Sequence, residues 1–186
     1  MKVGVLGLQG DFREHLQVLK RLDVEARDVR TTKDLAEVNA LILPGGESTT
    51  MVHLMAQDGL DQAIKERHRK GMPLYGTCAG MILLAQEIVD SKLRGLGLID
   101  IAVSRNAYGR QVDSFEADLQ IKNIGAFHAV FIRAPKIIRR SSSVEALAEH
   151  EGAPVLARQG HVLVSSFHPE LTNDTRIHEY FLSMVD

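Results

Sequence analysis

The sequence has one cysteine and no tryptophan among its 186 residues. A single thiol cannot form a disulfide within the chain, so the fold must depend on its core, and a reducing compartment, the cytoplasm, is expected. Aromatic residues are also few, at 5%, but hydrophobic residues make up 45% of the chain. A chain of this length buries a substantial core without disulfides or metal ions.

Long hydrophobic runs and an excess of one charge are missing as well. No segment approaches the roughly 20 apolar residues of a membrane-spanning helix, and the apolar run Val3–Leu8 is too short for a signal peptide. The formal net charge is −2, without a long basic stretch. We therefore expect neither a membrane nor a nucleic acid as a partner. The histidines and the cysteine show no metal-ligand spacing, so we expect no bound metal or other cofactor.

Strands and helices alternate through the first half of the chain. Apolar, often β-branched stretches predict buried strands at Lys2–Leu8, Val24–Val29, Ala40–Leu43 and around Leu74. Helical spacing of apolar residues predicts helices at Phe12–Leu22, 32–37, Thr50–Met55, Leu60–Lys70 and Met81–Val89. This order predicts an α/β fold with a mostly parallel sheet flanked by helices.

The first helix can be predicted in more detail. Asp11 precedes it and is its expected N-cap. Helical spacing places Phe12, Leu16 and Leu19 on the face that packs against the core.

The second half of the chain has a different character. Strands with glycine-containing turns between them are predicted at Leu93–Val103, Ser114–Ile121 and Ala129–Ile132, which indicates a small antiparallel excursion at the edge of the core. Pro154–Ala157 and Val162–Ser166 are expected to form a hairpin, and a last helix is expected from Thr175 to about Val185, capped by Asn173 or Asp174. No linker or repeat occurs, so residues 1–186 are expected to form a single domain.

The segment Gly76-Thr77-Cys78-Ala79-Gly80 lies between a predicted strand and a predicted helix. It is the cysteine counterpart of the Gly-x-Ser-x-Gly nucleophile elbow, in which flanking glycines permit a sharp strand-to-helix turn. Such a turn places the sulfur at a helix N-terminus, where free N–H groups and the helix dipole favour the thiolate. A lone cysteine is more often a small buried apolar residue, but the two glycines favour a nucleophile. We interpret Cys78 as that nucleophile.

His168-Pro169-Glu170 is the second informative segment. The proline favours an extended backbone at His168, and residues two apart on an extended segment point to the same side. The segment therefore presents an imidazole with a carboxylate beside it, as a base and its orienting group require. Alone it would be interpreted as a surface turn; together with the elbow it predicts a Cys-His-Glu triad. Both segments follow strands, where open α/β sheets place their sites.

Pro44-Gly45-Gly46-Glu47-Ser48 also follows a strand. Two glycines let the backbone approach a ligand closely and turn an N–H toward a developing oxyanion. A simple turn in which Ser48 or Thr49 caps the next helix is an alternative, and the two are compatible. A phosphate-binding loop is disfavoured, because no Gly-Lys-Ser/Thr follows.

Six segments together resemble the class I glutamine amidotransferase family and, within it, the glutaminase subunits of pyridoxal 5′-phosphate synthases. They are Gly7–Phe12, Pro44–Thr50, Gly76–Gly80, Ser104–Gln111, Phe131–Pro135 and Ser166–Glu170. They occur in order along nearly the whole chain and are highly specific together, and no catalytic position departs from the family pattern.

This resemblance implies a role for each matching residue. Cys78 attacks the side-chain amide of L-glutamine, His168 protonates the departing ammonia, and Glu170 orients His168. Gly46 and Ala79 match the family's oxyanion donors. The positions that match its glutamine-binding residues are Gly46, Glu47, Ser48, Arg105, Ile132 and Arg133.

The resemblance also implies a partner. In the family, ammonia passes to a separate (β/α)₈ synthase subunit, which makes pyridoxal 5′-phosphate within a large hetero-oligomer. The predicted core, excursion and triad occupy the chain and leave no room for an ammonia-accepting domain, so a partner chain is expected. Gln9 and Gly10 follow the first strand and open at the same edge as the elbow, which makes them a plausible partner-coupling element.

Two other functions compete with this one. A cysteine peptidase or deglycase-like hydrolase would keep the triad and change the substrate; Pro44–Thr50 and Arg133–Pro135 argue against it. A regulatory subunit that binds glutamine without hydrolysing it is disfavoured because Cys78, His168 and Glu170 are all intact.

Overall fold

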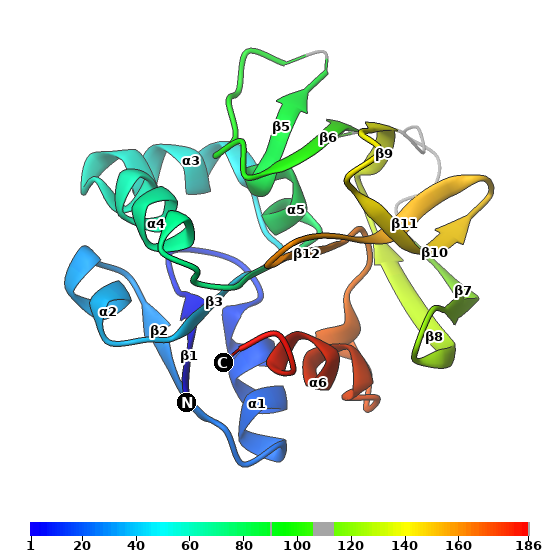
Figure 1. Ribbon diagram of the computed structural model, residues 1–186, viewed down its shortest axis with the longest axis horizontal. Helices are drawn as coiled ribbons and strands as arrows, with labels where there is room; N and C mark the ends of the chain where they lie inside the picture. Colours follow the sequence, from blue (N-terminus) through cyan, green and yellow to red (C-terminus); the bar gives the residue numbers. More distant parts are fainter. Residues whose placement is uncertain (90, 106–113, 186) are drawn as a thin grey trace.

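The computed structural model describes residues 1–89, 91–105 and 114–185. Its largest element is a seven-stranded sheet with the order β10-β11-β12-β4-β3-β1-β2 (Figure 1). The strands of this sheet are β1 (Lys2–Leu6), β2 (Glu25–Val29), β3 (Ala40–Leu43), β4 (Leu74–Thr77), β10 (Glu145–His150), β11 (Ala153–Gln159) and β12 (Val162–Ser165). The strands from β2 to β12 pair in parallel, and β11 runs antiparallel to both of its neighbours. The predicted mostly parallel sheet and the hairpin of β11 and β12 are confirmed.

Helices cover both faces of this sheet. They are α1 (Phe12–Arg21), α2 (Thr32–Ala36), α3 (Ser48–Gln57), α4 (Leu60–Arg69), α5 (Ala79–Leu84) and α6 (Arg176–Leu182), with a short 3₁₀ helix η1 (Pro169–Leu171). Figure 1 shows α3, α4 and α5 on one side of the strands and α1 and α6 on the other. Among the described residues, no helix has the length and apolarity needed to cross a membrane.

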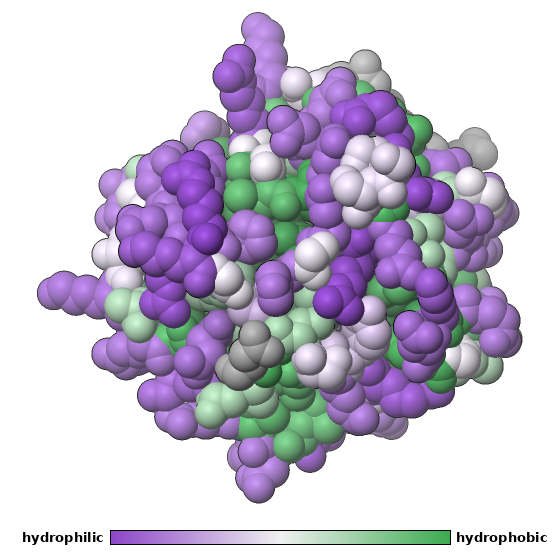
Figure 2. All heavy atoms as spheres, in the orientation of Figure 1, coloured by the Kyte–Doolittle hydropathy of each residue, from purple (hydrophilic) through white to green (hydrophobic). Residues whose placement is uncertain are grey.

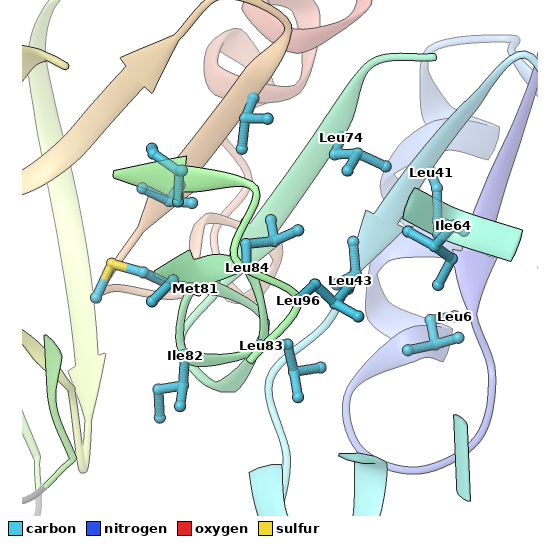
Figure 3. Packing of buried hydrophobic residues seen from close by; sticks show 14 of the residues in the cluster. Leu6, Leu41, Leu43, Ile64, Leu74, Met81, Ile82, Leu83, Leu84 and Leu96 are labelled. Atoms are coloured by element: carbon cyan, nitrogen blue, oxygen red, sulfur yellow. The ribbon is translucent and has the colours of Figure 1, made fainter. Parts of the chain in front are cut away.

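Two hydrophobic clusters form because successive strand residues point to opposite faces. On the α3–α5 side, Leu6, Leu43 and Leu74 from the strands pack against residues such as Ile64 and Leu83 from the helices (Figure 3). The second cluster contains the alternate strand residues, Val5, Ile42 and Tyr75 among them, with α1, α6 and part of the second half of the chain. The outside differs from both: the face in Figure 2 is mostly hydrophilic, with hydrophobic atoms in small groups.

The second half adds two smaller sheets. One has three strands, β5 (Ala85–Ile88), β6 (Ile99–Ser104) and β9 (Lys136–Arg140), and the other is the antiparallel pair of β7 (Ser114–Ile121) and β8 (Gly125–Ile132). The expected antiparallel excursion is therefore confirmed. Strands β9 and β10 were not predicted from the sequence. The strand expected from Leu93 begins at Ile99.

The helix expected over Met81–Val89 was wrong beyond Leu84, where β5 begins. The carbonyls of residues 83–85, which would accept the next helical bonds, are occupied instead. They accept from the N–H groups of residues 96–98 at 2.6–3.2 Å. A segment distant in sequence therefore ends α5 and converts the following residues into an extended strand.

The capping predictions also need correction. Asp11 occupies the N-cap position of α1, but its side chain makes no capping hydrogen bond. The N-cap of α3 is Glu47, whose carboxylate accepts from the N–H groups of Thr49 and Thr50, so neither Ser48 nor Thr49 caps this helix. The last helix spans Arg176–Leu182, and its N-cap is Thr175 without a side-chain capping hydrogen bond, so neither Asn173 nor Asp174 is its N-cap, although Asp174 Oδ1 accepts from the Arg176 N–H at 3.1 Å.

Candidate active site

Cys78 lies at the junction of β4 and α5, with a strained backbone at φ 50° and ψ −107°. Its N–H donates to the Ser165 carbonyl at 2.8 Å, which fixes the turn to the neighbouring strand. A Cβ at Gly80 would overlap the carbonyl oxygen of Leu43, and one at Gly76 would meet the Gly80 backbone. Glycine is required at both flanks because backbone atoms fill the space of a side chain.

The three residues expected to form a triad lie together. Cys78 follows β4 and His168 follows β12, and these strands are parallel neighbours whose carboxyl ends meet at one edge of the sheet. His168 Nδ1 is 2.6 Å from Glu170 Oε1, and both side chains are buried. The imidazole interacts with the Cys78 side chain, which lines the same cavity. The backbone N–H of His168 donates to the Val130 carbonyl at 2.8 Å, which sets the position of the ring.

Electrostatics in this group favour a protonated imidazole. Burial lowers the pKa of His168, but hydrogen bonds to Cys78 and Glu170, with the negative charges on both, outweigh it and raise that pKa to about 10. Burial raises the pKa of Glu170, an effect that its hydrogen bond to His168 opposes. The positive charge on His168 therefore compensates the buried carboxylate, and the imidazolium keeps its proton beside the sulfur at neutral pH.

A cavity of about 500 Å³ opens in front of Cys78 and His168. Its lining includes nearly all the residues that the sequence singled out: Gln9, Gly10, Gly46, Glu47, Ser48, Cys78, Ala79, Arg105, Ile132, Arg133 and His168. Glu170 lies behind His168 and does not line this cavity. Asp11, Ile82 and the 44% exposed Leu171 complete the lining; Asp11 was predicted as a helix cap within the Gly7–Phe12 segment, and the other two were not predicted.

The Gly45–Glu47 loop is tied to the segment after β1. The Asp11 N–H donates to the Gly45 carbonyl at 3.0 Å. The Glu47 N–H donates to Gln9 Oε1 at 2.7 Å. Gly10 packs so closely on the Gly45 carbonyl that a Cβ there would overlap it. A displacement of residues 9–11 would therefore also move this loop.

Glu47 and Arg105 form an ion pair at the cavity, with 3.3 Å between Nη2 and Oε1. The pKa of Glu47 is lowered to about 2, chiefly by the hydrogen bond from the Thr50 N–H. Glu47 is thus an ionised cap of α3 as well as a cavity residue. Residues 106–111 of the segment that begins at Ser104 lie outside the described part of the chain.

Arg133 and Ile132 approach the sulfur from β8 and the turn that follows it. The Ile132 carbonyl oxygen is 3.8 Å from Cys78 Sγ. Arg133 has a positive φ of 42°, a conformation that a long side chain rarely adopts. Such strain is retained where the surroundings fix it, and it is frequent at ligand sites.

Two further residues lie close to the triad, and these positions were not predicted from the sequence. Asp11 Oδ2 lies 3.7 Å from His168 Nδ1, and His15 Nε2 lies 3.6 Å from Glu170 Oε2. Asp11 and His15 are four residues apart at the start of α1, so helical spacing was the available signal. Asp11, His168 and Glu170 each offer one possible metal ligand within 4.8 Å of the others, but their contacts within the triad account for this cluster.

Comparisons with known proteins agree with this geometry. Residues 5–186 match a family model described as the SNO glutamine amidotransferase family. The chain is 55% identical to the "Pyridoxal 5'-phosphate synthase subunit PdxT" of Thermosipho africanus, over 100% of this chain and 99% of that protein. It is 56% identical to the protein of the same name from Thermus thermophilus, over 98% of this chain and 97% of that protein.

Solved structures give the same picture. A structure titled "Crystal structure of glutamine amidotransferase" has a TM-score of 0.95 at 53% identity and covers 98% of this chain and 97% of its own. The structure of PurLQS from Thermotoga maritima has a TM-score of 0.75 at 15% identity, covering 98% and 97%, and therefore shares the fold.

Proposed function

Because the chain belongs to the SNO glutamine amidotransferase family, we propose that it hydrolyses L-glutamine as the glutaminase subunit of a pyridoxal 5′-phosphate synthase. Its product ammonia passes to the synthase subunit. The observation that carries this function is that Cys78 and His168 line one cavity, with Glu170 hydrogen-bonded to His168 from behind it. The same cavity contains the residues of the other matching segments.

The first half of the reaction breaks the amide bond. The Cys78 thiolate attacks the side-chain carbonyl carbon of glutamine and forms a tetrahedral intermediate. His168 then gives its proton to the amide nitrogen, the C–N bond breaks, and ammonia leaves a glutamyl thioester on the sulfur. Glu170 holds His168 through Nδ1, so the opposite ring nitrogen faces the reacting atoms.

The second half restores the enzyme. His168 takes a proton from water, and the resulting hydroxide attacks the thioester carbon. The carbon–sulfur bond breaks, which releases glutamate and returns the thiolate and imidazolium. The N–H of Ala79, at the first position of α5, and the N–H of Gly46 are the donors to the oxyanion in both halves.

The other residues that line the cavity bind the glutamine substrate. Arg105, which pairs with Glu47 in the free cavity, has the charge and planar donors that the substrate's α-carboxylate requires. Glu47, Ser48, Ile132 and Arg133 complete this side and hold the amide near the sulfur.

The partner is a (β/α)₈ synthase subunit, and the assembly is a large hetero-oligomer in the cytoplasm. Its docking at Gln9 and Gly10 acts on the oxyanion loop, because Gln9 and Asp11 both hydrogen-bond that loop. Docking therefore sets the Gly45–Gly46 peptide for catalysis. Gln9→Ala should lose most of the activation by the partner while retaining glutamine binding.

The test measures ammonia release from glutamine by the purified chain, with and without a synthase subunit. We expect weak turnover alone and strong turnover in the complex, and none with Cys78→Ala, which should still fold and bind the partner. Substantial turnover by Cys78→Ala would contradict the triad. Hydrolysis of peptide or glyoxal substrates without glutamine hydrolysis would contradict the assignment of glutamine as the substrate.

A further inference from the structure

Two fully buried histidines lie behind the triad, on the α1 and α6 side of the sheet. His15 Nδ1 is 2.9 Å from His178 Nε2, and His15 Nε2 is 3.0 Å from Thr77 Oγ1. Burial lowers the pKa of both imidazoles, and the neighbouring imidazoles His178 and His168 lower that of His15 further. Both rings are therefore neutral in the folded protein, so each has one N–H and one acceptor nitrogen.

Two atoms of this region lack a hydrogen-bond partner. Among the described residues, the buried side-chain nitrogen and oxygen atoms without one are Glu170 Oε2 and His178 Nδ1. Glu170 Oε1 is engaged by His168, and Oε2 lies 3.6 Å from His15 Nε2. A buried carboxylate oxygen without compensation is destabilising. The only compensation that His15 can offer is an N–H at Nε2.

The location of the shared proton decides whether His15 offers that N–H. If His15 Nδ1 donated to His178, His15 Nε2 would carry no proton, and the proton on His178 Nδ1 would be buried without an acceptor. If His178 Nε2 donates to His15 Nδ1, the orphan at His178 is a lone pair, and His15 Nε2–H points toward Thr77 and Glu170. The second arrangement compensates the carboxylate and buries no orphan N–H.

We infer that His15 and His178 are positioning residues of the glutaminase reaction, a neutral chain that presents the Nε2–H of His15 to the free oxygen of Glu170. At 3.6 Å this N–H acts on Oε2 as a directed dipole, while Thr77 accepts the hydrogen bond. Because His15 carries no charge, it supports the carboxylate without competing with the imidazolium of His168. The inference rests on the proposed function for its kinetic readout.

The pair of His15 and His178 also connects the triad to α1. His15 follows Asp11 by one helical turn, and Asp11 Oδ2 lies 3.7 Å from His168 Nδ1. The start of α1 therefore reaches both the base and its carboxylate, directly after the Gln9–Asp11 segment that binds the oxyanion loop.

Two amide substitutions separate positioning from packing. The side-chain nitrogen of glutamine reaches the place of Nε2, and that of asparagine reaches only the place of Nδ1. In complex with the synthase subunit, His15→Asn should lower kcat for glutamine hydrolysis roughly tenfold, as expected for losing support of a buried charge. His15→Gln should retain most of the activity, and KM should change little in either variant.

A second measurement needs no turnover. The rate of Cys78 alkylation by iodoacetamide at fixed neutral pH reports the thiolate–imidazolium pair, and it should fall severalfold in His15→Asn but not in His15→Gln. If wild type released no ammonia from glutamine, the proposed function would fail, while the alkylation comparison would still test the histidine chain.

The matched pair His178→Asn and His178→Gln repeats the comparison one residue further from Glu170, with a smaller loss expected in the asparagine variant. It also replaces the first pair if His15→Asn does not fold. Thermal unfolding of every variant shows whether activity follows stability. Equal kcat and equal alkylation rates in the asparagine and glutamine variants, or losses that follow the unfolding temperature alone, would overturn the inference.

Discussion

The two faces of the seven-stranded sheet share the same strands but pack against different chemistry. On the α3–α5 face, leucines from β1, β3 and β4 meet apolar helix residues (Figure 3). The α1 and α6 face is also largely apolar, but it buries His15 and His178 together with Thr77 and Ser165. Buried polar groups are unfavourable unless they are paired, so the second face carries a cost that the first avoids. His178 and Thr77 contact His15, which lies 3.6 Å from Glu170. Ser165 donates to the Phe167 carbonyl, directly before His168.

Strand β4 shows the contrast between adjacent residues. Leu74 points into the apolar cluster, whereas Tyr75 points to the other face. The Tyr75 hydroxyl is 3.0 Å from Ser165 Oγ, which donates to the Phe167 carbonyl at 3.1 Å. This second polar chain ends one residue before His168. We expect substitutions of polar-face residues that directly support Glu170 or the backbone before His168 to change catalysis, and substitutions on the apolar face to change stability alone.

The largest effect is expected at the triad itself. His168→Ala should lower kcat by roughly a thousandfold or more, because the proton donor is lost. Glu170→Gln should be milder, since the carboxylate orients and supports the base without taking its proton. Both variants are measured as ammonia release in complex with the synthase subunit. An equal or greater loss in Glu170→Gln would show that its role is misjudged.

On the apolar face, Leu74→Ala should lower the free energy of unfolding by about 2–5 kcal/mol, the range for deleting a buried leucine side chain. Leu74 is fully buried on the strand that leads to Cys78. Because it contacts no residue of the triad, kcat of the folded complex should stay near that of wild type. Urea unfolding and ammonia release measure the two quantities. A loss of kcat comparable to the loss of stability would remove the distinction between the faces.

The polar face should also respond to pH. Burial lowers the pKa of His178 to about 3, whereas a histidine of the unfolded chain titrates near about 6.5. The stability that neutral His178 contributes is therefore complete above about pH 6.5 and is lost as the pH falls toward the folded pKa. His178→Gln removes this proton uptake and keeps a side-chain N–H.

Between pH 7.5 and 5, the free energy of unfolding of wild type should fall by about 2 kcal/mol relative to His178→Gln, since about 1.5 pH units act at about 1.36 kcal/mol each. Groups common to both proteins, His168 included, cancel in the difference. Urea unfolding of both proteins at each pH provides the values. Parallel pH profiles would show that His178 does not titrate as its burial requires.

Much of the fold and the catalytic group could be predicted from sequence because the signals are local. The Gly-x-Cys-x-Gly and His-Pro-Glu segments each follow a strand, and parallel strands bring their carboxyl ends to one edge. That both segments lie at strand ends could be predicted from this rule, whereas the pairing of β4 with β12, which places Cys78 beside His168, is seen only in the structure. The same rule placed Gln9 and Gly10 at the edge of the elbow, and the structure adds their contacts with Gly46 and Glu47.

The rest depends on contacts between distant residues. The change from α5 to β5 is imposed by N–H groups of residues 96–98, which no local pattern near Ala85 announces. Glu47 caps α3 where Ser48 or Thr49 was expected, because its longer side chain returns to two N–H groups. His15 shows no metal-ligand spacing, and the sequence gives no sign of its role because its partners are distant in the chain: His178 is 163 residues away.

Modest effects on kcat should separate the two hydroxyl groups behind His168. Because the Ser165 hydroxyl donates to the Phe167 carbonyl, the Tyr75 hydroxyl is the donor to Ser165. Tyr75→Phe and Ser165→Ala therefore leave different polar groups without a hydrogen-bond partner. Tyr75→Phe leaves one lone pair of Ser165 unpaired and should lower the free energy of unfolding by about 1 kcal/mol, with kcat within about twofold of wild type. Ser165→Ala leaves a buried Tyr75 hydroxyl and the Phe167 carbonyl unpaired. It should be more destabilising, by about 2–3 kcal/mol, and lower kcat severalfold because the backbone before His168 loses its support. Urea unfolding and ammonia release by the single variants and the double variant measure both effects. If Tyr75→Phe proved as damaging to kcat as Ser165→Ala, the support of this backbone would depend on the Tyr75 hydroxyl as much as on the bond from Ser165 to the Phe167 carbonyl, and the expected difference between the two hydroxyl groups would be wrong.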